Sequence, residues 1–440
     1  MSETPMRTVL PLLVVLAYPP ALAVADAPPR KTLEECIAIA LAQQPTLQAA
    51  DANVLAARER VWQTAAAYLP QVSASYAANR RAASAGSLTG GGFQGGGFQS
   101  AARTRTFNFY STGVALTQIL FDFGQNLAFI HREQALARSS AADAVTQRDS
   151  VVFDVSQSYL ALLADYRLRD VADETVRQSQ QHLDLAQGRF EVGFAPKFDV
   201  TQAQVQLANA ELAQVTARNN VTLGRETLRH AMGLFEPLSF DIVDVLEEPA
   251  VSLDEARALE LAYDHRPELQ SIGAQREAAL LQIKALQKDY LPKVGGNAAY
   301  NWTGSTYPLQ DSWNVGASVN LSVFNGGLTT AQIGEAKANL ASVAANEAAL
   351  RQSITLEVQQ ALVNVRQGIE SLRVAEKGLR QARENVELAE GRYSTGAGSI
   401  IELTDAQASL ASAEASVIQA RVNSRTAVAA LERATATPID

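Results

Sequence analysis

The sequence predicts a mainly α-helical protein with transmembrane β-strands, built from a tandem-duplicated unit. Three observations predict this fold class: motifs that recur along the chain, two long windows without proline, and short segments in which apolar and small polar residues alternate. We expect each copy to supply two strands and long coiled-coil helices, so that one protomer contributes four strands.

The overall composition excludes one class of partner. The 440 residues carry a formal net charge of −9, with 47% hydrophobic and 6% aromatic residues. A surface that binds nucleic acid needs clustered Lys and Arg to neutralise phosphates, and the sequence has no such cluster. We therefore expect no nucleic-acid partner.

Residues 1–25 have the features of a cleaved export signal. Arg7 precedes an apolar stretch at 9–18, and Ala-Val-Ala at 23–25 offers a cleavage site. The apolar stretch is too short and too rich in proline to span a membrane, and no run of about 18 apolar residues follows it. If the mature chain crosses a membrane, strands must do so.

Recurring motifs divide the chain into two copies. Gly-Arg-Phe-Glu-Val-Gly at 188–193 recurs as Gly-Arg-Tyr-Ser-Thr-Gly at 391–396, an offset of 203 positions. Tyr-Leu-Pro at 68–70 recurs at 290–292, an offset of 222 positions. These offsets predict a first copy at 30–235, a linker at 236–252 and a second copy at 253–434.

The first copy carries a long insertion. The two offsets, 222 and 203, differ by 19 residues, and the excess falls between Pro70 and Phe121. A Gly-rich and Gln-rich run at 90–99 lies within it, which is typical of a loop. We expect an extracellular loop at about 84–104.

The windows without proline predict two very long helices. No proline occurs between Pro70 and Pro196, or between Pro308 and Pro438. Apolar residues recur at alternating spacings of three and four in both windows, as Val152, Val155, Tyr159, Leu162 and Tyr166, and as Val358, Leu362, Val365, Ile369 and Leu372. A helix over 126–190 would be about 100 Å long, and such a helix needs coiled-coil neighbours.

Between the helical windows the period changes to two, which predicts strands at about 70–79, 107–120, 293–302 and 313–324. One face of these strands is apolar and the other is small and polar, as in a lipid-facing barrel wall. Interfacial aromatic residues are expected toward the loop ends of the strands, at Tyr76, Tyr110, Tyr300, Trp302 and Trp313. Two hairpins that cap a soluble helical bundle are the alternative.

Four strands cannot close a barrel, and unpaired sheet edges are not tolerated in hydrocarbon. Two protomers would give eight strands, whose interior is filled by side chains, whereas three give twelve and leave room for a lumen. We therefore predict a homotrimer.

These features resemble the TolC family of outer-membrane efflux proteins. The likeness covers about residues 33–431 and rests on the duplicated Tyr-Leu-Pro and on paired turns at 192–194 and 395–397. It implies a 12-stranded barrel in outer-membrane lipid and an α-helical tunnel in the periplasm. It also implies a periplasmic adaptor (membrane fusion) protein and an inner-membrane transporter as partners. Together they would give small molecules or polypeptides a passive, gated exit.

The resemblance makes the turns at 192–199 and 395–402 candidate adaptor-docking tips. The candidate residues are Val192, Gly193, Phe194, Asp199, Thr395, Gly396, Ala397 and Glu402. Gly193 and Gly396 suit the positive φ of a chain reversal, and Pro196 prevents continuation of the helix. Turn architecture alone is the alternative explanation. Turns of the family commonly read Val-Gly-Leu before an acidic residue, whereas here the first reads Val-Gly-Phe before Asp199 and the second is degenerate. These departures leave the adaptor's identity open.

Four carboxylates precede the tips and form a candidate acidic ring at the periplasmic entrance: Asp184, Glu384, Glu387 and Glu390. Asp184 and Glu387 occupy equivalent positions in the two copies, so a trimer would place six of them around the narrow end. Acidic rings select cations. A solvated helix face is the alternative.

The sequence offers no enzymatic site. Its four histidines, His131, His182, His230 and His265, are widely separated, and Cys36 is the single cysteine. We expect no enzyme, no metal and no cofactor. The alternative function is a periplasmic coiled-coil adaptor or structural protein that is not inserted in the membrane, and the strand at 313–324 is the feature that argues against it.

Overall fold

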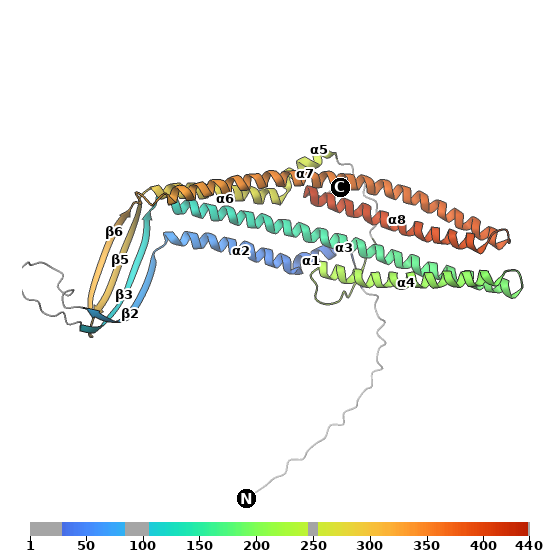
Figure 1. The fold of residues 1–440 in the computed structure, drawn as a ribbon, viewed down its shortest axis with the longest axis horizontal. Coiled ribbons are helices and arrows are strands. Elements are labelled where there is room, and N and C mark those ends of the chain that lie inside the picture. The colour runs from blue at the N-terminus through green and yellow to red at the C-terminus, as the bar shows by residue number, and fades with distance from the viewer. Residues whose placement is uncertain (1–28, 84–104, 245–253, 439–440) are drawn as a thin grey trace, which may run out of the picture.

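A computed structural model describes residues 29–83, 105–244 and 254–438. Within them the molecule is elongated, with a β-sheet at one end and long helices that run away from it (Figure 1). The expected export signal, the Gly-rich loop and residues 245–252 of the expected linker lie outside the described residues.

The two copies fold alike. The first contains α1 (Leu33–Gln43), α2 (Pro45–Ala65), η1 (Ala66–Tyr68), β2 (Gln71–Ala83), β3 (Arg105–Phe121), α3 (Gln125–Glu191) and α4 (Lys197–Ala231). The second contains α5 (Glu255–His265), α6 (Pro267–Gln287), η3 (Lys288–Tyr290), β5 (Lys293–Gly304), β6 (Gln310–Asn320), α7 (Leu328–Ser394) and α8 (Ile400–Thr435). Corresponding helices match in length to within one residue, with 67 residues in both α3 and α7 and with 35 and 36 residues in α4 and α8. The mainly helical fold class expected from the sequence is confirmed.

Proline begins the same helix in each copy. Pro45 and Pro267 stand at the first positions of α2 and α6, where a missing N–H group costs nothing because the first turn has no internal acceptor for it. The residues before them, Gln44 and Arg266, are extended and end α1 and α5. Each copy therefore enters the sheet through a short helix, a bend and a longer helix.

The four long strands form one antiparallel sheet in the order β2-β3-β5-β6. The last strand was expected to reach residue 324, but β6 ends at Asn320, so Leu321 and Val323 lie outside it. Asn320 pairs with Lys293, the first residue of β5, and Pro292 just before it has no N–H group with which to continue the ladder. Among residues 29–83, 105–244 and 254–438, the outer edges of β2 and β6 have no partner strand.

The long helices form two hairpins, α3 with α4 and α7 with α8, and α3 also packs against α8. The buried seam of α7 differs from the expected one at a single place. Ile369 is exposed, and the neighbouring Gly368 is buried instead. A Cβ atom on Gly368 would lie 2.9 Å from the Ser424 Cα atom, so its missing side chain allows α7 and α8 to approach.

Part of the expected linker is bound to the first copy. The two-residue strand β4 (Asp241–Ile242) pairs in parallel with β1 (Arg30–Lys31) near the middle of α3. The Tyr159 hydroxyl donates to the carbonyl oxygens of Lys31, at 3.1 Å, and Val243, at 2.5 Å. Residues 240–243 are thus anchored to α3 by a buried side chain.

None of the described helices is both long enough and apolar enough to span a membrane.

Candidate functional site

The tips of the two hairpins lie at the end of the molecule opposite the sheet (Figure 1). Gly193 and Gly396 have φ values of 76° and 77°, a region that side chains disfavour. At the first tip the Phe194 N–H donates to the Arg189 carbonyl at 2.8 Å, and at the second the Ala397 N–H donates to the Arg392 carbonyl at 2.9 Å. Both helices therefore end in the same glycine-dependent reversal.

The helices that follow the tips begin in different ways. Pro196 directly precedes α4, whereas the Ser399 side chain caps α8 by accepting from the Glu402 N–H at 3.2 Å. The Glu402 carboxylate also pairs with Arg392 at 3.3 Å. Glu402 thus stabilises its own turn, and its carboxylate already forms an ion pair within the chain.

The two tips expose different chemistry. The Val192 and Phe194 side chains of the first tip are 66% and 86% exposed. The second tip exposes Thr395 and Ala397 at the equivalent positions, and the Thr395 hydroxyl donates to the Gly391 carbonyl at 3.1 Å. The first tip is therefore an apolar surface, and the second is small and polar.

One side chain joins the two tips. The Arg189 guanidinium donates to the carbonyl oxygens of Tyr393 and Ser394, both at 2.7 Å, and its centre lies 4.6 Å from the Tyr393 ring centroid. The equivalent Arg392 stays within its own tip, near Glu402. The sequence motif contained both arginines, but the duplication gave no sign that only Arg189 crosses between hairpins.

Two ionisable side chains, Tyr393 and Asp199, lie next to Arg189 where the two tips meet. Tyr393 is buried, and its hydroxyl has no hydrogen-bond partner within the part of the chain that the structure describes. Burial raises the pKa of Tyr393, the charge of Asp199 raises it further, and Arg189 opposes both. Burial also raises the pKa of the half-buried Asp199, again against Arg189.

The candidate acidic ring is divided between two helices: Asp184 lies on α3, and Glu384, Glu387 and Glu390 lie on α7. All four side chains are exposed. Asp184 accepts a hydrogen bond from Gln180, one turn earlier, at 2.8 Å. Which way these carboxylates face in an assembly remains a prediction.

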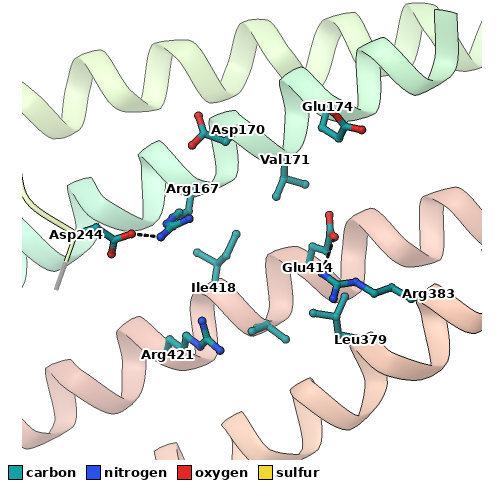
Figure 2. Close-up of a pocket in the computed structure, with 11 residues that line it drawn as sticks. Arg167, Asp170, Val171, Glu174, Asp244, Leu379, Arg383, Glu414, Ile418 and Arg421 are labelled. Carbon is teal, nitrogen blue, oxygen red and sulfur yellow. Dashed lines mark hydrogen bonds and ion pairs between the residues drawn. The ribbon is translucent and has the colours of Figure 1, made fainter. Parts of the chain in front are cut away.

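A groove of about 580 Å³ separates the hairpins above the tips. Figure 2 shows that Val171 on α3 faces Ile418 across it, with charged side chains around them. The charged lining residues all form ion pairs, as Arg167–Asp244, Arg169–Asp170, Arg177–Glu174, Arg383–Glu414 and Arg421–Glu376. The groove therefore offers paired charges rather than a free one to a small ligand. Among the described residues, no three His, Cys, Asp or Glu side chains gather as metal ligands.

The sheet has one apolar face. Directly paired residues of antiparallel strands share a face, and the register pairs Tyr300 with Trp313 and Thr112 with both Tyr76 and Trp302. The interfacial aromatic residues predicted from the sequence all fall on this face, namely Tyr76, Tyr110, Tyr300, Trp302 and Trp313. The opposite face carries small and polar residues such as Ser73, Asn297 and Asn314.

An amphipathic sheet continued by paired helical hairpins is the arrangement of the fold class predicted from the sequence, a mainly helical protein with membrane β-strands. A family model described as outer membrane efflux protein matches residues 36–234 and 258–437. The chain belongs to this family, and the two matched regions correspond to its two copies. The protein is therefore located in the outer membrane, with its helices in the periplasm.

Relatives of known name are distant. The fusaric acid resistance protein FusA of Burkholderia cepacia is 26% identical over 251 residues, which cover 54% of this chain and 46% of FusA. The outer membrane protein TolC of Escherichia coli K12 is 23% identical over 336 residues, which cover 72% of this chain and 67% of TolC. The matched part thus spans only about half the length of FusA.

Solved structures share the fold over nearly the whole chain. A membrane protein from Pseudomonas aeruginosa aligns with a TM-score of 0.80 at 20% identity, covering 92% of this chain and 93% of that one. The outer membrane protein VceC of Vibrio cholerae aligns with a TM-score of 0.75 at 19% identity, covering 93% and 97%. At these identities the likeness establishes the fold.

Proposed function

We propose that the protein is a subunit of a homotrimeric duct that gives small molecules or polypeptides a passive, gated exit across the periplasm and the outer membrane. The observation that carries this proposal is the apolar face of a sheet with two unpaired edges, continuous with helices of 67 residues. Unpaired edges are not tolerated in lipid, so other copies must complete the sheet. Three copies supply twelve strands and leave a lumen.

A periplasmic adaptor and an inner-membrane transporter complete the proposed pathway, because the chain belongs to the outer membrane efflux protein family and its relatives include an efflux pump outer membrane protein. Relatives of the chain include a toluene efflux pump outer membrane protein and an antibiotic efflux pump outer membrane protein, both from Pseudomonas putida. Such names support small organic molecules as one class of cargo.

Single-channel recording tests the duct. The mature protein, purified in detergent and added to a planar bilayer under a salt gradient, should show discrete openings. A folded helical protein that stays silent and is found in the soluble periplasmic fraction would instead support the adaptor alternative.

The first tip is the proposed adaptor-docking surface, because Phe194 is exposed and apolar there. Phe194→Asp should abolish site-specific cross-linking of the trimer to its adaptor. Phe235→Asp is the control, because Phe235 is 89% exposed but follows the opposite end of α4. If Phe194→Asp still cross-links to the adaptor, the residues of the first tip serve only to form the turn.

The proposed acidic ring predicts cation selectivity. Replacing Asp184 with Asn and Glu387 with Gln should shift the reversal potential toward that of a nonselective pore. The control replaces Asp51 with Asn and Glu59 with Gln, two residues that are exposed on α2. This control should have the same reversal potential as the wild type. An unchanged reversal potential in the first double variant would assign these carboxylates to a solvated outer face.

A further inference from the structure

An arginine continues the apolar face of the sheet at the end far from the helices. On this face the register pairs Val72 with Leu116, and Ala78 with Tyr110. Arg80 pairs with Asn108 in the same series, and both side chains are exposed. The face that begins with aliphatic residues therefore ends in a cation and an amide on the extracellular side.

The depth of Arg80 suits a headgroup rather than hydrocarbon. It lies two residues beyond the Ala78–Tyr110 pair, or about 7 Å at the usual rise of a strand. Tyr and Trp side chains mark the boundary between hydrocarbon and headgroups in membrane proteins. A cation just outside that boundary meets polar lipid groups without the desolvation cost of the bilayer centre.

Three tyrosines form a cluster below this arginine. The ring centroids of Tyr110 and Tyr307 are 5.3 Å apart, and Tyr76 pairs with Thr112, two residues from Tyr110 on the same face of the sheet. Tyr307 lies in the β5–β6 turn, which brings its ring over β3. The rings of Tyr76 and Tyr307 are exposed, so the cluster presents both phenol groups and aromatic surface.

The adjacent arginine, Arg81, lies in a different environment. Arg81 pairs with Phe107, so it lies on the opposite face of the sheet, and its guanidinium carbon is 4.4 Å from the Phe109 ring centroid. Arg80 has no such aromatic contact among the described residues. The side chains of these two neighbouring arginines thus lie on opposite faces of the sheet.

We propose that Arg80, Asn108 and the tyrosine cluster bind the headgroup of a phosphorylated glycolipid in the outer leaflet. Arg80 would pair with a phosphate, Asn108 would donate from its amide group, and the tyrosine rings would pack against the sugar. A phosphate alone would need only the cation, so the exposed tyrosine rings on the same face, within four residues of Arg80 along the strand, favour the glycolipid over an anionic glycerophospholipid. The proposal rests on the apolar face meeting lipid, as the proposed function requires.

Lipid retention tests this site. Wild-type, Arg80→Ala and Arg81→Ala proteins are placed in nanodiscs of phosphatidylethanolamine with added lipid A or, separately, phosphatidylglycerol. Bound lipids are then counted by native mass spectrometry. Wild type and Arg81→Ala should retain lipid A, Arg80→Ala should retain about fivefold less, and phosphatidylglycerol should be retained less than lipid A by wild type.

Four results would overturn the site: equal lipid A retention in wild type and Arg80→Ala, equal loss in Arg81→Ala, phosphatidylglycerol retained as well as lipid A, or loss of assembly in Arg80→Ala. Conductance of the same three preparations separates the two proposals. If all conduct but Arg80→Ala retains its lipid, only the lipid site fails. If wild type does not conduct, the duct itself fails.

Discussion

At the scale of single residues, His182 of the first hairpin lies at the contact with the second hairpin. It lies half-buried on α3, its ring contacts the Gln407 amide on α8, and the charge of Glu390 on α7 reaches it. Burial lowers the pKa of His182, and Glu390 opposes that shift without cancelling it. Folding therefore favours the neutral ring.

This environment predicts a loss of stability in acid. Because the folded-state pKa lies below the ordinary value of about 6.5, the stabilisation is present above pH 6.5 and is lost as the pH falls toward and through the folded value. The melting temperature, followed by circular dichroism, should fall between pH 7.5 and 5.5, and it should fall less in His182→Gln.

His265→Gln is the control, because His265 is exposed on α5. It should retain the wild-type pH dependence. If His182→Gln loses as much stability in acid as wild type, the acid sensitivity arises elsewhere.

At the scale of elements, close packing of α7 on α8 depends on Gly368. Its missing Cβ atom would lie 2.9 Å from a backbone atom of Ser424, which cannot move without displacing α8. Gly378, ten residues later in the same helix, has no atom within 4 Å of its Cβ position. These two glycines of α7 therefore differ in their role: Gly368 allows close helix packing, whereas Gly378 does not take part in it.

Alanine substitution should separate them. Gly368→Ala should destabilise the protein by about 1–3 kcal/mol, because the helices must move apart. Gly378→Ala should stabilise it by about 0.5–1 kcal/mol, since alanine loses less backbone freedom in a helix. Urea unfolding followed by circular dichroism measures both, and equal effects would contradict the packing explanation.

At the scale of the whole molecule, the two faces of the sheet differ in chemistry. Val315 pairs with Ala298 on the apolar face near the middle of β6, and Asn314 pairs with Ala299 on the opposite face. Completion of the sheet by other copies would direct the first face to lipid and the second to the lumen.

Adjacent substitutions test this division. Val315→Arg should cost about 2–4 kcal/mol of folding free energy in liposomes, because it places a charge near the bilayer midplane. Asn314→Arg should cost much less and should alter ion selectivity instead. Similar costs at both positions would show that neither face meets lipid.

Much of this architecture is local in origin, and the sequence by itself determined it. Pro45 and Pro267 begin the same helix in both copies, and Gly193 and Gly396 reverse the chain, because each residue restricts or frees its own backbone. The periods of two and of three to four residues separated strands from helices because the geometry of each element sets which residues share a buried face. The recurring motifs then revealed the duplication.

Contacts between segments far apart in sequence were decided only by the tertiary structure. Arg189 reaches the other hairpin while its equivalent Arg392 does not, and Gly368 replaces Ile369 in the buried seam. The linker segment 240–243 is anchored to Tyr159. These outcomes depend on which surfaces meet, and a pattern within one segment contains no information about the partner that it will face.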